Sequence, residues 1–137
     1  MKPTVLVVDD DSKYVALLNR TLKRGGFQVL TASDGCEVPD MLSTTSIDVL
    51  VMDLQMPGMN GWELLRNMRE SRTATQLNVG NTPGRPKIVV VSARNEDETA
   101  TFVRRLGADA YVTKPFWSEQ LLAAVRGVLD EPAAPSV

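Results

Sequence analysis

The sequence predicts an α/β protein built on a five-stranded parallel sheet with helices on both faces, a three-layer α/β/α sandwich. Two observations lead to this prediction. Short apolar runs rich in β-branched residues alternate with longer amphipathic runs as far as residue 129. Most of the short runs lack polar alternation, as expected for parallel strands that are covered on both faces. Strict β-α alternation of this kind favours right-handed crossovers between parallel strands.

The short apolar runs are expected to be the strands, and they are Thr4–Val8, Gln28–Ala32, Ile47–Asp53, Lys87–Ala93 and Ala110–Thr113. The first helix is expected at Ser12–Arg24, where the apolar residues fall on one face and two glycines follow as a stop. The last helix is expected at Ser118–Leu129. Each of these segments ends or begins next to a turn residue, so the five strands and their connecting helices follow one another without a break in the pattern.

Three further helices are expected to begin with a polar cap followed three residues later by a glutamate: Asp34/Glu37, Asn60/Glu63 and Asn95/Glu98. This spacing lets the glutamate side chain reach back to the backbone of the cap, as in a capping box. Pro39 falls in the first turns of the second helix, where a missing N–H costs least.

Residues 1–129 are expected to form one domain, and residues 130–137 a disordered tail or the stub of a linker. The segment Thr73–Pro86 has no helical periodicity and contains several glycines and prolines. So long a connection between a helix and a strand is unusual. We interpret residues 73–86 as an extended loop that is either a mobile surface segment or a surface that contacts a partner, with five basic residues nearby in the sequence.

Composition excludes several classes of function. The chain has no histidine, which removes histidine-based acid–base catalysis, Ser-His-Asp triads and most zinc sites. Its formal net charge of −2 gives no indication of a nucleic-acid or membrane surface. No apolar run approaches the length of a membrane span, and Cys36 is the only cysteine. These features predict a cytoplasmic protein.

Polar side chains follow the predicted strands at the edge where ligands of open parallel sheets bind. The first strand ends in Asp9 and Asp10, the third in Asp53 and the fourth in Ser92, and the fifth leads to Lys114. Taken singly, each is an ordinary helix cap, turn residue or surface residue. The flavodoxin-like strand order 2-1-3-4-5 would make the four strands neighbours, so that all these groups meet.

The chemistry of this set is that of phosphoryl transfer. Three carboxylates repel one another unless a cation binds among them, and Mg²⁺ prefers such oxygen ligands. A carboxylate can also act as a nucleophile and form an aspartyl phosphate. Lys114 and Mg²⁺ would neutralise the phosphoryl charge, Ser92 would donate a hydrogen bond to a phosphoryl oxygen, and the loop after Asp53 would supply the Gln55 backbone carbonyl to the metal.

Four segments in this order resemble the receiver domain of two-component response regulators, the CheY-like superfamily: "VLVVDDD", "VMDLQMPGMNGWELL", "VVVSA" and "GADAYVTKPF". The resemblance covers about Met1 to Leu129. It implies that Asp53 is the phosphoacceptor, that Asp10 and Asp53 ligate Mg²⁺, and that Asp9 contacts the metal directly or through water.

The same resemblance assigns further roles. The Gln55 backbone carbonyl would complete the protein ligands of the metal, and Lys114 would contact the phosphoryl group. Ser92 would be the switch hydroxyl and Tyr111 the switch aromatic. The bond before Pro115 is expected to be cis, since it is typically cis in this family. Asp11 has no role in this set, and we interpret it as the cap of the first helix.

The resulting hypothesis is a phosphorylation-activated bacterial signalling switch. A sensor histidine kinase or His-phosphotransfer protein would donate the phosphoryl group, and the domain would catalyse only its own Mg²⁺-dependent phosphorylation and dephosphorylation. Phosphorylation would then change the affinity of the domain for a downstream protein target or output domain. One form of this change would be a phosphorylation-dependent dimer through the face of strands four and five. No direct nucleic-acid or membrane partner is expected.

Other functions remain to be compared with this hypothesis. The main alternative is a phosphorylation-independent protein-binding module that keeps the receiver fold. An aspartyl phosphatase of another α/β family usually has a second acid two residues after the nucleophile, where this chain has Gln55. A flavin site would need a phosphate-binding loop after the first strand, where the acids of this chain would repel phosphate.

Overall fold

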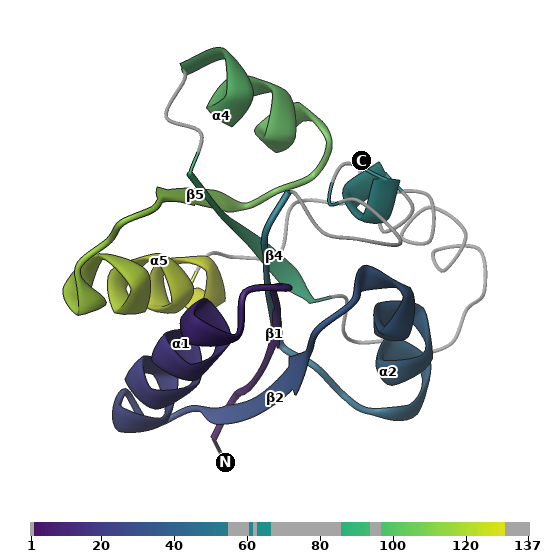
Figure 1. The fold of residues 1–137 in the computed structure, drawn as a ribbon, viewed down its shortest axis with the longest axis vertical. Coiled ribbons are helices and arrows are strands. Elements are labelled where there is room, and N and C mark those ends of the chain that lie inside the picture. The colour runs from purple at the N-terminus through teal and green to yellow at the C-terminus, as the bar shows by residue number, and fades with distance from the viewer. Residues whose placement is uncertain (1, 55–60, 62, 67–85, 94–96, 131–137) are drawn as a thin grey trace.

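The computed structural model describes residues 2–54, 61, 63–66, 86–93 and 97–130 (Figure 1). The strands are β1 Thr4–Val8, β2 Gln28–Ala32, β3 Val49–Met52, β4 Lys87–Ser92 and β5 Ala110–Thr113. The helices are α1 Ser12–Arg24, the 3₁₀ turn η1 Gly35–Glu37, α2 Val38–Thr44, α4 Asp97–Arg105 and α5 Ser118–Asp130. Gly61 and residues 63–66 are also helical.

The five strands form one parallel sheet in the order β2-β1-β3-β4-β5, which confirms the predicted fold class and strand order. In register, Val8 of β1 lies opposite Ala32 of β2 and Met52 of β3. Ser92 of β4 lies opposite Thr113 of β5. The carboxyl ends of all five strands therefore reach the same edge of the sheet.

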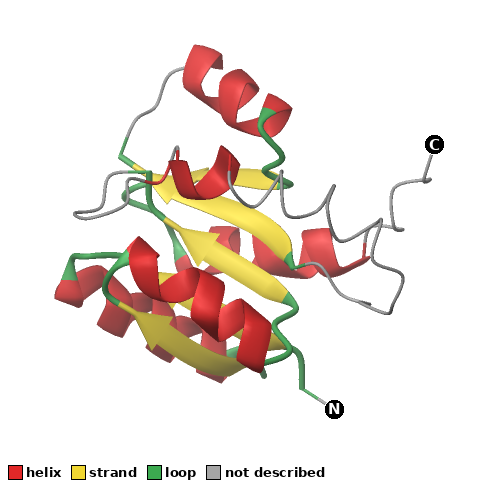
Figure 2. Cartoon of the chain, turned by 90° about the vertical axis from the view of Figure 1, so that its right-hand side faces the viewer, coloured by secondary structure: helices red, strands yellow, loops and turns green. Residues whose placement is uncertain are grey.

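Helices cover both faces of the sheet, and Figure 2 shows the strands as the middle layer between them. Alternate residues of the central strands enter two separate cores. Val5 and Val7 of β1 pack with apolar side chains of α1 and α5, which lie side by side in Figure 1. Leu6 and Val8 pack on the other face with side chains of α2, α4 and the helical turn at residues 63–66. A strand buried on both faces has no room for polar alternation, which explains the continuous apolar runs.

The predicted boundaries of α1 are confirmed. Asp11 caps the helix, because its carboxylate accepts a 2.9 Å hydrogen bond from the Lys13 N–H. The Gly25 N–H donates to the Thr21 carbonyl at the other end. Gly26 then adopts φ 96°, a left-handed conformation that glycine reaches without steric strain.

The capping box at Asp34 and Glu37 is also confirmed, although it begins a 3₁₀ turn that leads into α2. Pro39 lies in the first turn of α2, as expected. The two other predicted boxes begin at Asn60 and Asn95, which lie outside the described residues.

Three elements have bounds that differ from the prediction. The third strand is shorter and spans Val49–Met52, although Asp48 still donates its N–H to the Thr4 carbonyl and accepts from the Lys87 N–H. The fourth strand ends at Ser92 rather than Ala93, and α5 continues to Asp130, the first residue of the predicted tail. Residues 131–137 and nearly all of the extended loop 73–86 lie outside the described residues. Among the helices that the structure describes, none has the length and apolar character needed to cross a bilayer.

Candidate functional site

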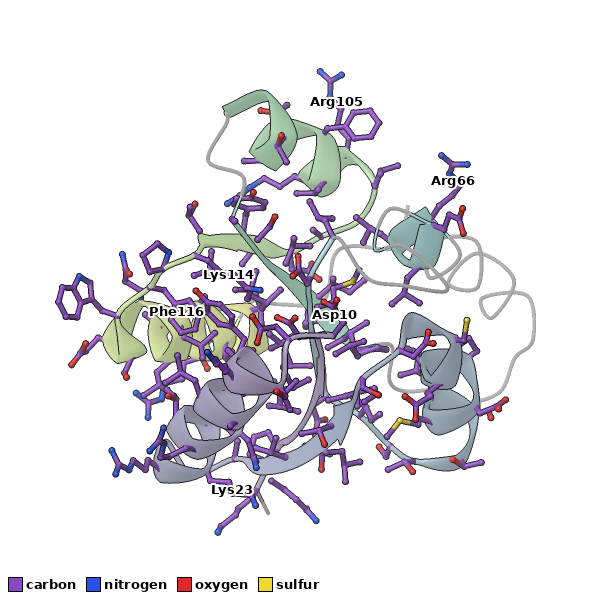
Figure 3. All side chains as sticks on the ribbon, viewed as in Figure 1. Asp10, Lys23, Arg66, Arg105, Lys114 and Phe116 are labelled. Atoms are coloured by element: carbon purple, nitrogen blue, oxygen red, sulfur yellow. The ribbon has the colours of Figure 1, made fainter. Side chains whose placement is uncertain are left out.

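The carboxyl edge of the sheet brings together an ammonium and two carboxylates from three strands. Asp9 follows β1, Asp53 follows β3 and Lys114 follows β5. The Lys114 Nζ donates to Asp9 Oδ2 at 2.7 Å and to Asp53 Oδ2 at 2.9 Å. Figure 3 places Lys114 in the same central region as Asp10, whose side chain belongs to this group. The three strands meet here because β1, β3, β4 and β5 are consecutive in the sheet.

Asp9 is the most enclosed acid of the site, with 2% of its surface exposed. Its Oδ1 accepts from the Asp11 N–H at 2.9 Å, while Oδ2 accepts from Lys114. Burial raises the pKa of Asp9 above its ordinary value, and the hydrogen bonds from Lys114 and the Asp11 backbone only partly offset this. The charge of Asp53 raises the pKa of Asp9 further. The carboxylate form of Asp9 is therefore less favoured in the folded chain than in water.

Lys114 is nearly as enclosed, since its side chain is 8% exposed. Burial alone would lower the pKa of Lys114, but the hydrogen bonds to Asp9 and Asp53 outweigh this and raise it above its ordinary value. The lysine therefore remains an ammonium at neutral pH. Its backbone is also held, because the Lys114 N–H donates to the Ser92 carbonyl at 2.8 Å.

Three carboxylates of the site could hold a metal ion. Asp9, Asp10 and Asp53 each offer one oxygen, and these oxygens lie within 4.8 Å of one another. Asp9 is buried, Asp53 is partly buried and Asp10 is exposed, so the cluster opens to solvent on one side. Within this group three carboxylates face the single ammonium of Lys114. The hard oxygen ligands and the excess negative charge fit Mg²⁺.

The two residues with predicted switch roles lie on neighbouring strands. Ser92 ends β4 and is buried, with 2% of its surface exposed. Tyr111 in β5 is opposite Val90 in register and is partly buried against the core on the α4 side of the sheet. It also lines a surface pocket with Gln120 and Ala124 of α5. Ser92 therefore lies at the carboxyl edge of the sheet, and Tyr111 lies two residues before the end of the neighbouring strand.

The remaining predicted residues have different outcomes. The Lys114–Pro115 peptide bond is cis, as the resemblance implies. Gln55 lies outside the described residues. From the sequence, Trp117 after the "KPF" segment is interpreted as a packing residue, with an exposed docking residue beside Lys114 as the alternative. Its side chain is 76% exposed, so the packing interpretation is wrong. It stands at the N-terminal boundary of α5, where its N–H donates to Gln120 Oε1, ahead of the first buried residue of the helix.

Sequence reasoning missed two residues that contact the site. The Lys114 Nζ lies 4.0 Å from the ring centroid of Tyr14, on the first turn of α1. Gly61 donates its N–H to the Leu54 carbonyl at 2.7 Å, and a Cβ at this position would overlap the Asp53 carbonyl and the Leu54 backbone. The available signals were the aromatic Tyr14 three residues after the last of the three acids and the glycine in the loop that follows Asp53.

Comparison with known proteins agrees with this geometry. Residues 5–126 match the family model of the response regulator receiver domain. The chain is 34% identical over 138 residues to the alkaline phosphatase synthesis transcriptional regulatory protein PhoP of Bacillus subtilis, covering 99% of this chain and 53% of that protein. It is 34% identical over 125 residues to the transcriptional regulatory protein CpxR of Escherichia coli K12, covering 91% and 48%. The chain thus spans about half the length of these curated relatives.

Solved structures give the same result. The receiver domain of the Francisella response regulator 1452 superposes with a TM-score of 0.80 at 29% identity, covering 93% of this chain and 97% of that one. The chemotaxis response regulator CheY4 of Vibrio cholerae superposes with a TM-score of 0.80 at 27% identity, covering 94% and 100%. Since the family model spans nearly the whole sequence, this chain belongs to the response regulator receiver domain family.

Proposed function

We propose that this chain is a phosphorylation-activated switch of a two-component system in which Asp53 accepts the phosphoryl group. The observation that supports this most directly is the surroundings of Asp53. Its side chain is 13% exposed, its Oδ2 lies 2.9 Å from the Lys114 ammonium, and two more carboxylates lie beside it. Asp53 combines partial access from solvent with a fixed positive charge at the reacting group, as phosphoryl transfer requires.

The donor in this proposal is a phosphohistidine of a sensor histidine kinase or a His-phosphotransfer protein. A carboxylate oxygen of Asp53 attacks phosphorus, and the P–N bond to the imidazole breaks. The electron pair of that bond goes to the imidazole nitrogen, which leaves as neutral imidazole because its other nitrogen carries a proton. The product is an acyl phosphate on Asp53, with one P–O bond formed for one P–N bond broken.

The other residues of the site would bind the metal and stabilise the charge of the phosphoryl group. Asp9, Asp10 and Asp53, with the Gln55 backbone carbonyl, would hold Mg²⁺, and Asp9 would contact it directly or through water. When bound, the metal supplies positive charge that offsets the charge of the phosphoryl oxygens. Lys114 supplies a second positive charge from the end of β5. The hydrogen bond from its backbone N–H to the Ser92 carbonyl keeps it at the edge of the sheet. Hydrolysis of the acyl phosphate by water at the same site returns Asp53 to its carboxylate.

Signal output in this proposal depends on β4 and β5. Phosphorylation adds charge next to Ser92, whose hydroxyl would donate to a phosphoryl oxygen, and Tyr111 would move with it. Both positions lie at one end of the face formed by β4, β5 and α4. Phe102 of α4 and Trp117 before α5 are large apolar side chains that are 51% and 76% exposed. They support a protein-binding surface here for a downstream target, an output domain or a second copy of the chain in the cytoplasm.

The test is phosphoryl labelling with radiolabelled acetyl phosphate and Mg²⁺. Wild type is expected to incorporate label, and Asp53→Asn to incorporate none. Asp40→Asn is the matched control, since Asp40 is an exposed acid on α2, remote in sequence from the site. Equal labelling of wild type and Asp53→Asn would remove Asp53 as the acceptor.

The alternative is a phosphorylation-independent binding module. Such a module would have no use for a carboxylate whose pKa is raised by burial and that lies beside two further carboxylates. Titration with Mg²⁺ separates the two functions, because the module is expected to bind no metal at Asp9, Asp10 and Asp53.

A further inference from the structure

The Lys114 ammonium has a third partner besides the two carboxylates. Its Nζ lies 4.0 Å from the ring centroid of Tyr14, well within the distance over which a cation is attracted to an aromatic face. An ammonium has three N–H donors, and the hydrogen bonds to Asp9 and Asp53 use two of them. The face of the Tyr14 ring is therefore the third side on which the ammonium is held.

The Tyr14 ring is itself held in place by rigid elements. It belongs to the first turn of α1, which Asp11 caps through its side chain and its carbonyl. The ring also contacts Phe116, with centroids 6.1 Å apart and planes inclined by 42°, a tilted arrangement favourable for aromatic pairs. Phe116 packs in turn against the core beneath α1 and α5. The position of the ring is set by the packing of α1 on the segment that carries Lys114.

We infer that Tyr14 is a positioning residue for phosphoryl transfer, because its ring face keeps the Lys114 ammonium at Asp53. This inference rests on the proposed function. The hold of Asp9 and Asp53 on the ammonium weakens during that reaction, since a divalent cation would share their oxygens and Asp53 becomes an acyl phosphate. The Tyr14 ring takes part in neither change, so its attraction for the ammonium persists throughout.

A purely structural role for Tyr14 makes a different prediction. Tyr14, Leu17, Pro115 and Phe116 line one surface pocket between α1 and the segment after β5. If Tyr14 only filled space there, any apolar side chain of similar length would replace it. If its ring positions the ammonium, phenylalanine replaces it and leucine or methionine does not, because only the aromatic residue presents a negative face to the cation.

The first experiment needs no phosphorylation. The lysine side chains of the whole chain are labelled for NMR, and the Lys114 resonance is assigned from its absence in Lys114→Arg. The methylene protons next to its ammonium are expected upfield of those of the other lysines in wild type and in Tyr14→Phe, because they lie over a ring. The displacement is expected to vanish in Tyr14→Leu and Tyr14→Met. An unchanged displacement in the two apolar variants, or none in wild type, would overturn the inference.

The second experiment measures the rate of labelling by acetyl phosphate at saturating Mg²⁺. Tyr14→Phe is expected to stay within about twofold of wild type, and Tyr14→Leu and Tyr14→Met to be slower by roughly 3- to 30-fold. Leu17→Ala is the matched control, since it trims the same pocket one turn further along α1. Thermal melting of each variant shows whether it is folded, and so separates a slower reaction from a loss of folding. If one of the two apolar variants does not fold, the other still tests the inference.

The outcomes distinguish the inference from the proposed function. Absence of label on wild type would reject the proposed function and leave the NMR result to decide whether the ring holds the ammonium. Label on wild type with an equal rate in the folded Leu and Met variants would reject the role of Tyr14 alone. A rate loss in Leu17→Ala as large as that in Tyr14→Leu would also reject it, because packing would then explain both.

Discussion

The bodies of the strands and their carboxyl ends differ sharply in this molecule. Val5, Val7 and Leu50 lie in the interior of their strands with none of their surface exposed, among apolar side chains on both faces of the sheet. One residue after β1 ends, Asp9 is equally buried but carries a carboxylate beside two more. Burial stabilises the apolar side chains and raises the pKa of the acid. The same burial therefore stabilises the fold in one region and disfavours the charge of a carboxylate in the other.

The largest effect is expected in the body of a strand. Leu50→Ala should lower the free energy of unfolding by about 2–5 kcal/mol, because it leaves a cavity in a fully buried core. Urea unfolding with and without Mg²⁺ measures this. The loss should be the same in both conditions, since Leu50 packs among apolar side chains of the core on the α4 side of the sheet. A loss that Mg²⁺ reverses would show that the two regions are not independent.

The next effect is expected at the boundary between the regions. Gly61→Ala adds a Cβ that overlaps the Asp53 carbonyl and the Leu54 backbone, so one of them must shift. Overpacking of this kind should lower the free energy of unfolding by about 1–3 kcal/mol. It should also slow the labelling of Asp53 by acetyl phosphate, because the backbone of Asp53 moves. Gly127→Ala is the control, since a Cβ there meets nothing within 4 Å. Equal behaviour of the two variants would contradict the close approach.

A smaller effect is expected from metal binding at the strand ends. If Mg²⁺ binds the three carboxylates, it binds a group that exists only in the folded chain, so it should stabilise the fold by about 1–2 kcal/mol at ten times its dissociation constant. Thermal melting against Mg²⁺ concentration measures this. Asp10→Asn should reduce the gain, while Asp40→Asn should not. A melting temperature that millimolar Mg²⁺ leaves unchanged would argue against the metal site.

The smallest effect is expected from the titration of Lys114, because burial offsets part of what its hydrogen bonds contribute. The pKa of Lys114 in the folded chain is raised above its ordinary value of 10.5. The stability that this provides is therefore fully present below pH 10.5 and is lost as the pH rises through the folded pKa. Comparison of wild type with Lys114→Met by chemical unfolding between pH 9 and 12 should show the difference in stability shrinking over this interval. A difference that grows with pH would reverse the assigned sign.

The pKa of Asp9 is raised as well, so its contribution has the same sign as that of Lys114 but is lost at lower pH. Its folded pKa is raised above 3.8, so the fold gains stability from its protonation at low pH and loses that stability as the pH rises through the folded pKa. Mg²⁺ should reduce this loss, because it favours the carboxylate form. The variant Asp9→Asn lacks this acid, so the effect of Mg²⁺ on the pH dependence of its free energy of unfolding should disappear.

Much of the fold could be predicted from the sequence because its signals are local. The strands Thr4–Val8, Gln28–Ala32 and Ala110–Thr113 and the helix Ser12–Arg24 have the predicted bounds. Each is defined by an apolar run or by a cap and a glycine a few residues away. The prediction for the third strand was too long at both ends. Asp48 and Asp53 donate backbone hydrogen bonds to Thr4 and Val8 of β1, but they do not belong to the regular pairing of the strands.

The sequence by itself determined which groups reach the site. Each strand end follows directly from the apolar run before it, and the parallel order places Asp9, Asp53, Ser92 and Lys114 on one edge. The tertiary structure alone decided how these groups are held. The contact of Lys114 with Tyr14, the exposure of Trp117 and the close approach of Gly61 to Asp53 depend on how α1, α5 and the helical turn at residues 63–66 pack on the sheet. The packing of helices on the sheet sets these distances and exposures, and no local pattern of the sequence encodes them.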